Sequence, residues 1–428
     1  MMGSLALWAY LLASRLADPL APILLRRRLA RGKELRARLP ERLGHAAIAR
    51  PGGRLVWLHG ASVGEGLSML PLIAAMRRAD PAVAVLVTTG TVTSARQMAK
   101  ALPEGALHQF APVDAAGAVR RFLDHWRPDL AIWVESEFWP RLMIETGRRD
   151  IPMMLVNARV SARSAARWER IGGMARRLVG LFERIVTQDA PTRARLIAMG
   201  ADPARVREGG NLKMLADPPG ADADTLAALR AALAGRPVWL AASTHAPEEE
   251  AVLVAHRAMA PRIPGLVTIL APRHPERGDE LRGWLAAEGV QAASRSAGEM
   301  PAPEINVYLA DTLGEMGLWL RLAPVAFVGG SLADMGGHNP FEPAALDVAI
   351  LHGPHVANFA PAYGALTAAG GARVVADAGT LAAEASRLLT DPDARAAQTA
   401  AARAVLSQAR PDADALAAEA LALIGRAA

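Results

Sequence analysis

The chain of 428 residues contains no cysteine and only three lysines, against 45 arginines. Without cysteine there is no disulfide framework, no thiolate zinc site, no iron–sulfur cluster and no cysteine nucleophile. The sequence also lacks the motifs GxGxxG, GxxxxGKS/T and HExxH, which mark dinucleotide binding, P-loop phosphate binding and zinc proteolysis. The ten histidines are scattered and form no metal-ligand pattern with carboxylates. These absences argue against thiol-dependent and metal-dependent functions.

The formal net charge of +6 is concentrated in one segment. Residues 26–42 hold eight basic and two acidic residues, while Arg15 and Asp18 cancel within residues 1–25. Residues 43–428 are therefore neutral overall. A general nucleic-acid surface needs basic residues spread over a domain, so we expect no nucleic-acid partner. The apolar fraction of 52% excludes a mostly disordered chain.

The basic segment follows an apolar stretch of 21 residues, Leu5 to Leu25. As one helix this stretch would cross about 30 Å of hydrocarbon. Arg15 and Asp18 would share a face of that helix, where they could pair. A cleaved signal peptide carries its charges before the apolar stretch, whereas here they follow it, which places residues 26 onward in the cytoplasm. We expect a membrane-anchor helix that spans or inserts deeply; the alternatives are a helix in the interface and an ordinary soluble helix.

From residue 54 onward, short apolar runs alternate with helical stretches. The predicted strands are 54–60, 82–90, 129–136, 153–159 and 184–189 in the first half and 238–244, 266–272, 305–311, 325–331 and 348–354 in the second. Such alternation indicates a parallel α/β sheet with both faces covered. Two halves of this kind, joined by a crossover at 201–219, predict two Rossmann-like domains facing across a cleft. Ligands would bind beyond the carboxyl ends of the strands.

The first polar motif, His59 to Gly66, lies between a predicted strand and a predicted helix. Its glycines permit a sharp turn and the close approach of a ligand. Glu65 would lie near the helix N-terminus, where the helix dipole favours a carboxylate. It is a candidate general base that accepts a proton from a hydroxyl. The alternative is that it only caps the helix.

Two acids, Glu135 and Glu137, follow the third strand and are flanked by Trp133 and Trp139. If the strand continues through them, alternation places both carboxylates on the same side. Like charges that close raise at least one pKa. If the strand ends at Val134, the two acids belong to a loop instead.

Lys213 lies in a Gly-Asn loop, residues 209–213, at the junction of the two halves. In a chain so rich in arginine, a lysine here indicates a need for a compact ammonium group. Such a group could stabilise a phosphate or a carboxylate. Chance placement is the alternative.

Polar residues also follow four strands of the second half, at 243–245, 272–277, 311–316 and 329–342. In the last of these, Asn339 is expected as the N-cap, Pro340 at the first helical position and Glu342 at the third. A helix start that follows glycines predicts an anion site, although Glu342 could serve only in a capping box. Four polar strand ends that converge predict one ligand site.

Together and in this order, these segments resemble the 3-deoxy-D-manno-octulosonic acid (Kdo) transferases of lipopolysaccharide synthesis. The matching pieces lie between residues 57 and 359 and include LHGASVGEG, PDLAIWVESEFWP, GNLK, APRHPERGDEL, DTLGEM and GGHNPFEPAALD. The resemblance implies an α/β GT-B glycosyltransferase fold, with the active site between two Rossmann-like domains. The expected parts are a membrane anchor and basic segment at 1–42, an acceptor domain at 43–207 and a CMP-sugar donor domain at 208–428.

The resemblance further implies an inverting transfer of Kdo from CMP-Kdo to a lipid A precursor, at the cytoplasmic face of the inner membrane. Glu65 would be the base, and Glu135 and Lys213 would assist the transition state. The implied CMP-binding residues are Pro272, Arg273, Gly314, Glu315, Met316, Asn339, Pro340, Phe341 and Glu342. No metal and no cofactor is implied, because the donor carries its own leaving group. Anionic membrane lipids would contact the basic segment.

Two other functions stay open. One is a sugar transferase or epimerase of the same fold that uses a UDP-sugar, which a preference for uridine over cytidine nucleotides would favour. The other is a catalytically silent adapter tethered to the membrane. The presence of Glu65, Glu135 and Lys213 argues against the adapter.

Overall fold

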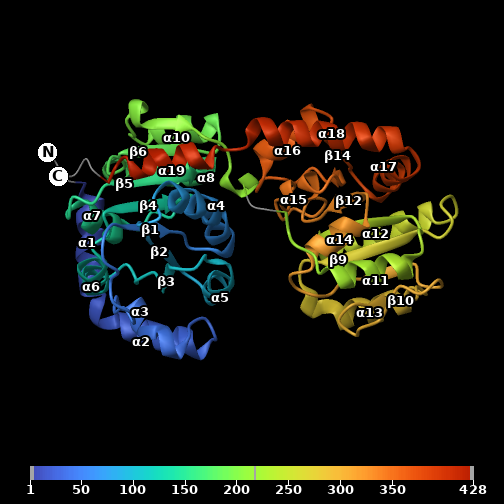
Figure 1. Cartoon of the computed structure of the whole chain (residues 1–428), viewed down its shortest axis with the longest axis horizontal. Coiled ribbons are helices and arrows are strands. Elements are labelled where there is room, and N and C mark those ends of the chain that lie inside the picture. The colour runs from blue at the N-terminus through green and yellow to red at the C-terminus, as the bar shows by residue number, and fades with distance from the viewer. Residues whose placement is uncertain (1–3, 216–217, 425–428) are drawn as a thin grey trace. The chain divides into compact units, whose positions relative to one another are not determined.

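A computed structural model describes residues 4–215 and 218–424 of the chain. It contains two compact units, each built on a parallel sheet of seven strands with helices on both faces (Figure 1). The first unit comprises Met1–Ala216 and Arg410–Ala428, and the second comprises Asp217–Ala409. The prediction of two parallel α/β sheets in one chain is therefore confirmed.

The first sheet has the strand order β3-β2-β1-β4-β5-β6-β7. Its strands are β1 Leu55–His59, β2 Ala84–Thr89, β3 Ala106–Phe110, β4 Leu130–Val134, β5 Met153–Ala158, β6 Arg184–Thr187 and β7 Val206–Glu208. The order reverses between β1 and β4, so the loops after these two strands diverge from a common point. In doubly wound sheets, ligands bind at this switch point.

Helices cover both faces of the first sheet. They are α4 Val63–Ala79, α5 Val92–Ala101, α6 Ala116–Trp126, α7 Pro140–Gly147, α8 Ala162–Glu169, α9 Gly172–Val179 and α10 Ala190–Ala198, with short 3-10 turns at Pro203–Arg205 and Leu212–Leu215. The central strands, such as β1 and β4, are buried on both faces, which explains why their apolar runs are continuous rather than alternating.

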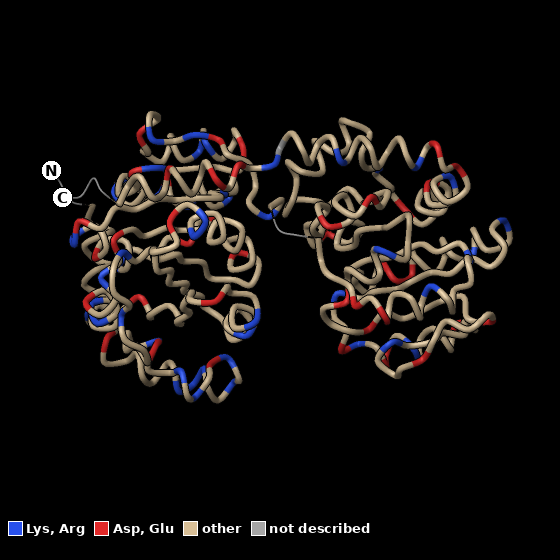
Figure 2. Tube along the Cα trace, in the orientation of Figure 1, with Lys and Arg blue, Asp and Glu red and all other residues tan. Residues whose placement is uncertain are grey.

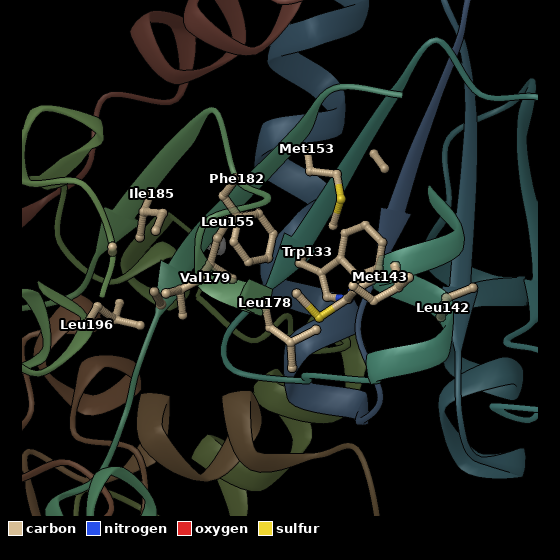
Figure 3. Close-up of a cluster of buried hydrophobic side chains, with 14 of the residues drawn as sticks. Trp133, Leu142, Met143, Met153, Leu155, Leu178, Val179, Phe182, Ile185 and Leu196 are labelled. Atoms are coloured by element: carbon tan, nitrogen blue, oxygen red, sulfur yellow. The ribbon is translucent and has the colours of Figure 1, made fainter. Parts of the chain in front are cut away.

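Trp133 of β4 forms the centre of one of the two hydrophobic clusters that flank this sheet. Figure 3 shows its ring among Met143 of α7, Leu178 of α9 and Phe182. The ring of Trp57 lies edge-on against it at 4.9 Å. This packing fixes α7 and α9 relative to the strand that ends next to Glu135.

The second sheet has the order β10-β11-β9-β8-β12-β13-β14 and reverses between β8 and β12. Its strands are β8 Val238–Thr244, β9 Val267–Pro272, β10 Ala292–Ser294, β11 Val307–Leu309, β12 Val325–Val328, β13 Ala349–His352 and β14 Ala372–Val374. The helices of this unit are α11 Ala223–Leu233, α12 Ala246–Met259, α13 Gly278–Ala287, α14 Met316–Leu322, α15 Phe341–Ala345, α16 Ala360–Ala368, α17 Ala378–Thr390 and α18 Pro392–Ala409, with a 3-10 turn at Pro275–Arg277.

The boundary between the units differs from the predicted division at 207/208. The turn Leu212–Leu215 belongs to the first unit, and residues 216 and 217, inside the predicted crossover, lie outside the described residues. The last helix, α19 Ala413–Leu421, also belongs to the first unit, where Leu416, Ala417 and Ala420 pack in the hydrophobic cluster that includes α4 (Figure 1). The chain thus returns to its first unit, which the sequence pattern does not indicate.

The predicted single helix over residues 5–25 is wrong. The structure has α1 Leu5–Leu16, a 3-10 turn at Asp18–Leu20 and α2 Ala21–Ala30, followed by a 3-10 turn at Arg36–Arg38 and α3 Leu39–Arg42. Pro19 has no N–H for a continuing helix and breaks it. Asp18 does not pair with Arg15 but accepts a hydrogen bond from the Gly117 N–H at the start of α6 (2.5 Å). Among the described residues, no helix is long and apolar enough to cross a membrane.

Candidate active site

Glu65 lies in the first turn of α4, directly after β1, on one side of the switch point. Ser62 caps this helix by accepting from the Glu65 N–H (3.3 Å), and its hydroxyl donates to Glu65 Oε1 (2.7 Å). The Ala61 N–H donates to Glu65 Oε2 (2.6 Å). The carboxylate is therefore held at both oxygens by its own loop.

Burial and neighbouring groups act on the carboxyl of Glu65. The residue is only 7% exposed, and this burial raises the pKa of its carboxyl above the ordinary value. The Ser62 hydrogen bond opposes the rise, and the negative charge of Glu135 adds to it. Gly60 leaves space for this arrangement, since a Cβ at this position would lie 3.0 Å from Glu65 Cβ and would displace the end of the Met69 side chain, whose Cε would lie 2.4 Å away.

Glu135 follows β4 on the other side of the switch point. Its backbone has φ of +61°, the left-handed region that a residue with a Cβ seldom adopts. Because β4 ends at Val134, the expectation that strand alternation aligns Glu135 with Glu137 is wrong. Glu137 instead accepts a hydrogen bond from Trp139 Nε1 (3.0 Å). Strained backbone of this kind is concentrated at functional sites, where it aims a particular side chain.

Lys213 is brought to Glu135 by the turn Leu212–Leu215. Its Nζ lies 2.8 Å from Glu135 Oε1. Lys213 also lies close to the first turn of α4, since a Cβ at Gly64 would lie 3.9 Å from its Nζ. Lys213, Glu135 and the start of α4 with Glu65 thus form one group at the carboxyl edge of the first sheet.

The turn that carries Lys213 is held by buried amides. Asn157, at φ +54° in β5, accepts from the Leu212 N–H through its side-chain Oδ1 (3.0 Å). Asn211 accepts from the Lys213 N–H (3.0 Å) and donates to Gln188 Oε1 (3.5 Å). Asn157 and Gln188 are positioning residues that sequence reasoning missed. The strand-end position of Asn157 was the available signal.

The second unit contains two adjoining cavities at its switch point, of about 190 and 170 Å³. Ser243 and Met316 line both of them. The first is also lined by His338, Asn339 and Glu342, and the second by Pro272, Arg273 and Gly314. Six of the nine residues expected at the donor site therefore line these cavities. The other three, Glu315, Pro340 and Phe341, are described below.

The expected helix start is wrong by one residue, because Pro340 and not Asn339 is the N-cap of α15. Asn339 Oδ1 still accepts a hydrogen bond from the Phe341 N–H (3.0 Å). Its amide donates to Glu342 Oε1 (3.1 Å), and burial raises the pKa of the Glu342 carboxyl. Pro340 and Phe341 are buried, and the Phe341 ring packs edge-on against Phe359. Both residues therefore contribute to packing rather than lining the cavities. Because α15 has only five residues, its dipole is small and the expected anion site at its start is weak.

Glu315 turns away from the cavities that its neighbours line. Arg295 holds it with two hydrogen bonds, from Nε (3.0 Å) and Nη2 (2.8 Å), and Thr312 Oγ1 donates to it as well. These contacts lower the pKa of Glu315. The carboxylate thus links Arg295 and Thr312 next to the turn at Gly314, whose φ is +86°.

The glycine-rich loop after β12 is already filled by a carboxylate. Glu248, which is fully buried at the start of α12, accepts hydrogen bonds from four successive N–H groups, of residues 330–333, at 2.7 to 3.3 Å. Successive N–H groups of this kind form an anion-binding nest. The anion here is the chain's own Glu248 side chain, so these four N–H groups are already occupied.

Several cavity residues are absent from the predicted set, among them Ser243 and His338. Ser243 sits at a bulge between β8 and β9 with φ of +56°. His338 lies with its Nε2 3.1 Å from His245 Nε2. Both stand at strand ends or in motifs visible in the sequence, but only the fold shows that they face a cavity. Among the described residues, no group of three or more histidines and carboxylates is placed to hold a metal ion.

The fold itself has known counterparts. UDP-GlcNAc 2-epimerase from Neisseria meningitidis, solved with UDP-GlcNAc bound, matches 86% of this chain and 100% of its own chain with a TM-score of 0.58 and 11% identity. Identity at this level shows the fold alone. The structure is therefore that of a two-domain α/β protein, with a parallel sheet that reverses its strand order in each domain.

The sequence comparisons identify the family. The model for 3-deoxy-D-manno-octulosonic-acid transferases (kdotransferases) matches residues 37–216. The 3-deoxy-D-manno-octulosonic acid transferase of Bordetella pertussis is 38% identical over 92% of this chain and 94% of the relative. That of Haemophilus influenzae is 34% identical over 76% of each. The chain belongs to the 3-deoxy-D-manno-octulosonic acid transferase family and is a glycosyltransferase that transfers Kdo.

Proposed function

We propose that this enzyme transfers Kdo from CMP-Kdo to a lipid A precursor, with inversion, and that Glu65 is the general base. The observation that carries the proposal is the group formed by Glu65, Glu135 and Lys213 at one sheet edge, with the pKa of Glu65 raised by burial. A buried carboxylate with a raised pKa takes a proton from a hydroxyl more readily than an exposed one.

In the proposed step, Glu65 accepts the proton of the acceptor hydroxyl as that oxygen bonds to C2 of Kdo. The bond between C2 and the phosphate oxygen breaks, and its electron pair leaves with CMP. The ion pair of Glu135 and Lys213 (2.8 Å) places an ammonium group beside the base. That ammonium would stabilise negative charge on the Kdo carboxylate or on the leaving phosphate.

The donor is proposed to occupy the two cavities of the second unit. Arg273 offers a planar fork that matches phosphate oxygens, and Asn339 and Glu342 offer partners for ribose hydroxyls. The single phosphate of CMP-Kdo needs no cation to bridge two phosphates, so we propose that neither a metal nor a cofactor takes part. The GT-B fold belongs to the same proposal.

Uridine and cytidine nucleotides distinguish this function from that of a UDP-sugar enzyme. CMP at about 100 times its Kd is expected to raise the Tm by roughly 5 °C, and UMP and UDP by much less. Arg273→Ala should remove most of the CMP shift, while Arg262→Ala, at an exposed position of the same unit, should retain it. Stronger protection by UDP would contradict the proposed donor.

We further propose that α1 and α2 lie in the surface of the inner membrane, at its cytoplasmic face. Seven large apolar side chains are exposed along these two helices and the turn between them: Leu5, Trp8, Leu12, Leu16, Leu20, Ile23 and Leu24. The spacing of the first four, three or four residues apart, gives one continuous face. Figure 2 shows basic residues grouped along α2, where anionic headgroups would meet them.

Vesicle binding tests this surface. Trp8→Glu together with Leu16→Glu is expected to weaken binding to vesicles of phosphatidylcholine and phosphatidylglycerol by at least tenfold, because each buried apolar side chain contributes about 1.5–3 kcal/mol. Both residues are about two-thirds exposed, so the fold should not change. The matched control is Ile48→Glu with Val254→Glu, which also charges two exposed apolar residues. Equal binding by the two variants, measured by flotation, would contradict the membrane assignment.

A further inference from the structure

We propose that the exposed arginines of α8 and α9 bind the phosphate groups on the sugar headgroup of the acceptor lipid. The residues of this arginine face are Arg163, Arg167, Arg170, Arg176 and Arg177, and all five are exposed. The inference rests on the proposed function and extends it, since it names the surface that selects the acceptor.

The charge of the arginine face is not compensated. Residues 161–180 contain these five arginines and one acid, Glu169, although residues 43–428 balance as a whole. Within the part of the chain that the structure describes, none of the five makes an ion pair or a side-chain hydrogen bond. Other arginines of this unit are paired, as Arg149 is with Asp124 and Arg205 with Glu183. An uncompensated cluster of this density is suited to a polyanionic ligand.

One end of the arginine face meets the catalytic edge of the sheet. Helix α8 starts at Ser161, three residues after the end of β5, which pairs with β4. Ser136, next to Glu135, donates a hydrogen bond to the carbonyl of Arg159. The ring of Trp168 on α8 packs edge-on against Phe138 at 5.7 Å. Helix α8 is thus fastened to the loop that carries Glu135.

The other end meets α1. Helix α9 packs against both α8 and α1, and a Cβ at Gly173 would lie 3.1 Å from Ser4 Cβ. Figure 3 shows Leu178 and Val179 of α9 in the cluster around Trp133, and this leaves Arg176 and Arg177 on the solvent side. The arginine face therefore connects the apolar surface of α1 to the edge of the sheet that carries Glu65 and Glu135.

The ligand class follows from this position and from the side-chain chemistry. Guanidinium groups bind phosphate oxygens as planar forks, and their charge persists at every physiological pH. A ligand that begins at the apolar surface of α1 and ends at the base is a lipid with a polar headgroup. Several arginines in a row, with one acid among them, fit a headgroup with more than one phosphate.

The test uses the full-length protein and the soluble disaccharide bisphosphate obtained by removing the acyl chains from the lipid A precursor. Arg163→Gln with Arg167→Gln, and Arg176→Gln with Arg177→Gln, are each expected to raise its Kd by roughly tenfold at low salt, since each surface cation contributes a factor of a few. The control pair, Arg262→Gln with Arg373→Gln, removes two exposed arginines of the second unit and should change the Kd less than twofold. CMP binding should be the same in all variants.

The second part of the test asks whether binding of the disaccharide depends on its phosphate groups. The dephosphorylated disaccharide should bind weakly and equally to wild type and variants. A Kd for the bisphosphate that stays within twofold in both α8 and α9 variants would overturn the proposal. So would intact headgroup binding combined with lost binding to phosphatidylglycerol vesicles, which would assign the face to general membrane adhesion. Arginine-dependent headgroup binding without any Kdo transfer would support this site while contradicting the proposed function.

Discussion

Replacing Glu65 by glutamine is expected to reduce Kdo transfer by about 10²- to 10⁴-fold, the contribution typical of a general base. Glutamine preserves the size of the side chain and can still accept from Ala61 N–H, but it cannot take up a proton. CMP binding, measured by calorimetry, should be unchanged because the donor cavities lie in the other unit. Glu104→Gln, at an exposed position of the first unit, is the matched control.

The pH profile provides the sharper test of the same residue. Since the pKa of Glu65 is raised, kcat/KM should rise with pH through an inflection above the ordinary range of a glutamate, about 4.3. Glu135→Gln removes a negative charge that contributes to this rise, so the inflection should move to lower pH. Normal turnover by Glu65→Gln would exclude Glu65 as the base. An inflection that stays at the same pH in Glu135→Gln would show that the charge of Glu135 does not act on Glu65.

The central strands of both sheets could be predicted from the sequence, and the outermost strands could not. Strands β3 and β7 border the first sheet, and β10 and β14 border the second. An edge strand has a neighbour on one side only, so it is short and need not be apolar; β7, for example, consists of Val-Arg-Glu. The central strands are buried on both faces and carry the continuous apolar runs that identify them.

The site shows a similar division. Glu65, Glu135 and Lys213 follow strands or lie at the junction, so their convergence follows from parallel topology alone. The positive φ of Glu135 depends on tertiary packing and leaves no local signal. Asn157 has a strand-end position as a signal, but the sequence does not show that its side chain contacts the Leu212 N–H. The arginine face was missed because charge was summed over residues 43–428. In that sum, acids elsewhere in the chain cancel the charge of the five arginines.

The second large effect is expected at Glu248. Glu248→Ala removes the acceptor of four backbone N–H groups, of residues 330–333, and leaves these donors in a buried loop without partners. Breaking a buried charged network typically costs about 3–5 kcal/mol of unfolding free energy. Because the same loop leads to His338 and Asn339 in the cavity wall, CMP affinity should also fall by at least tenfold.

Glu250→Ala is the matched control, since Glu250 is exposed on the same helix. It should change the unfolding free energy by less than about 0.5 kcal/mol. Glu248→Gln should lie between the two, because its amide keeps one acceptor oxygen for the loop and turns an NH₂ group toward the remaining donors. Urea unfolding and CMP calorimetry on the three variants separate stability from binding. If Glu248→Ala unfolds like Glu250→Ala, the loop is held by something other than this carboxylate. If it loses stability but keeps its CMP affinity, the loop does not shape the donor cavity.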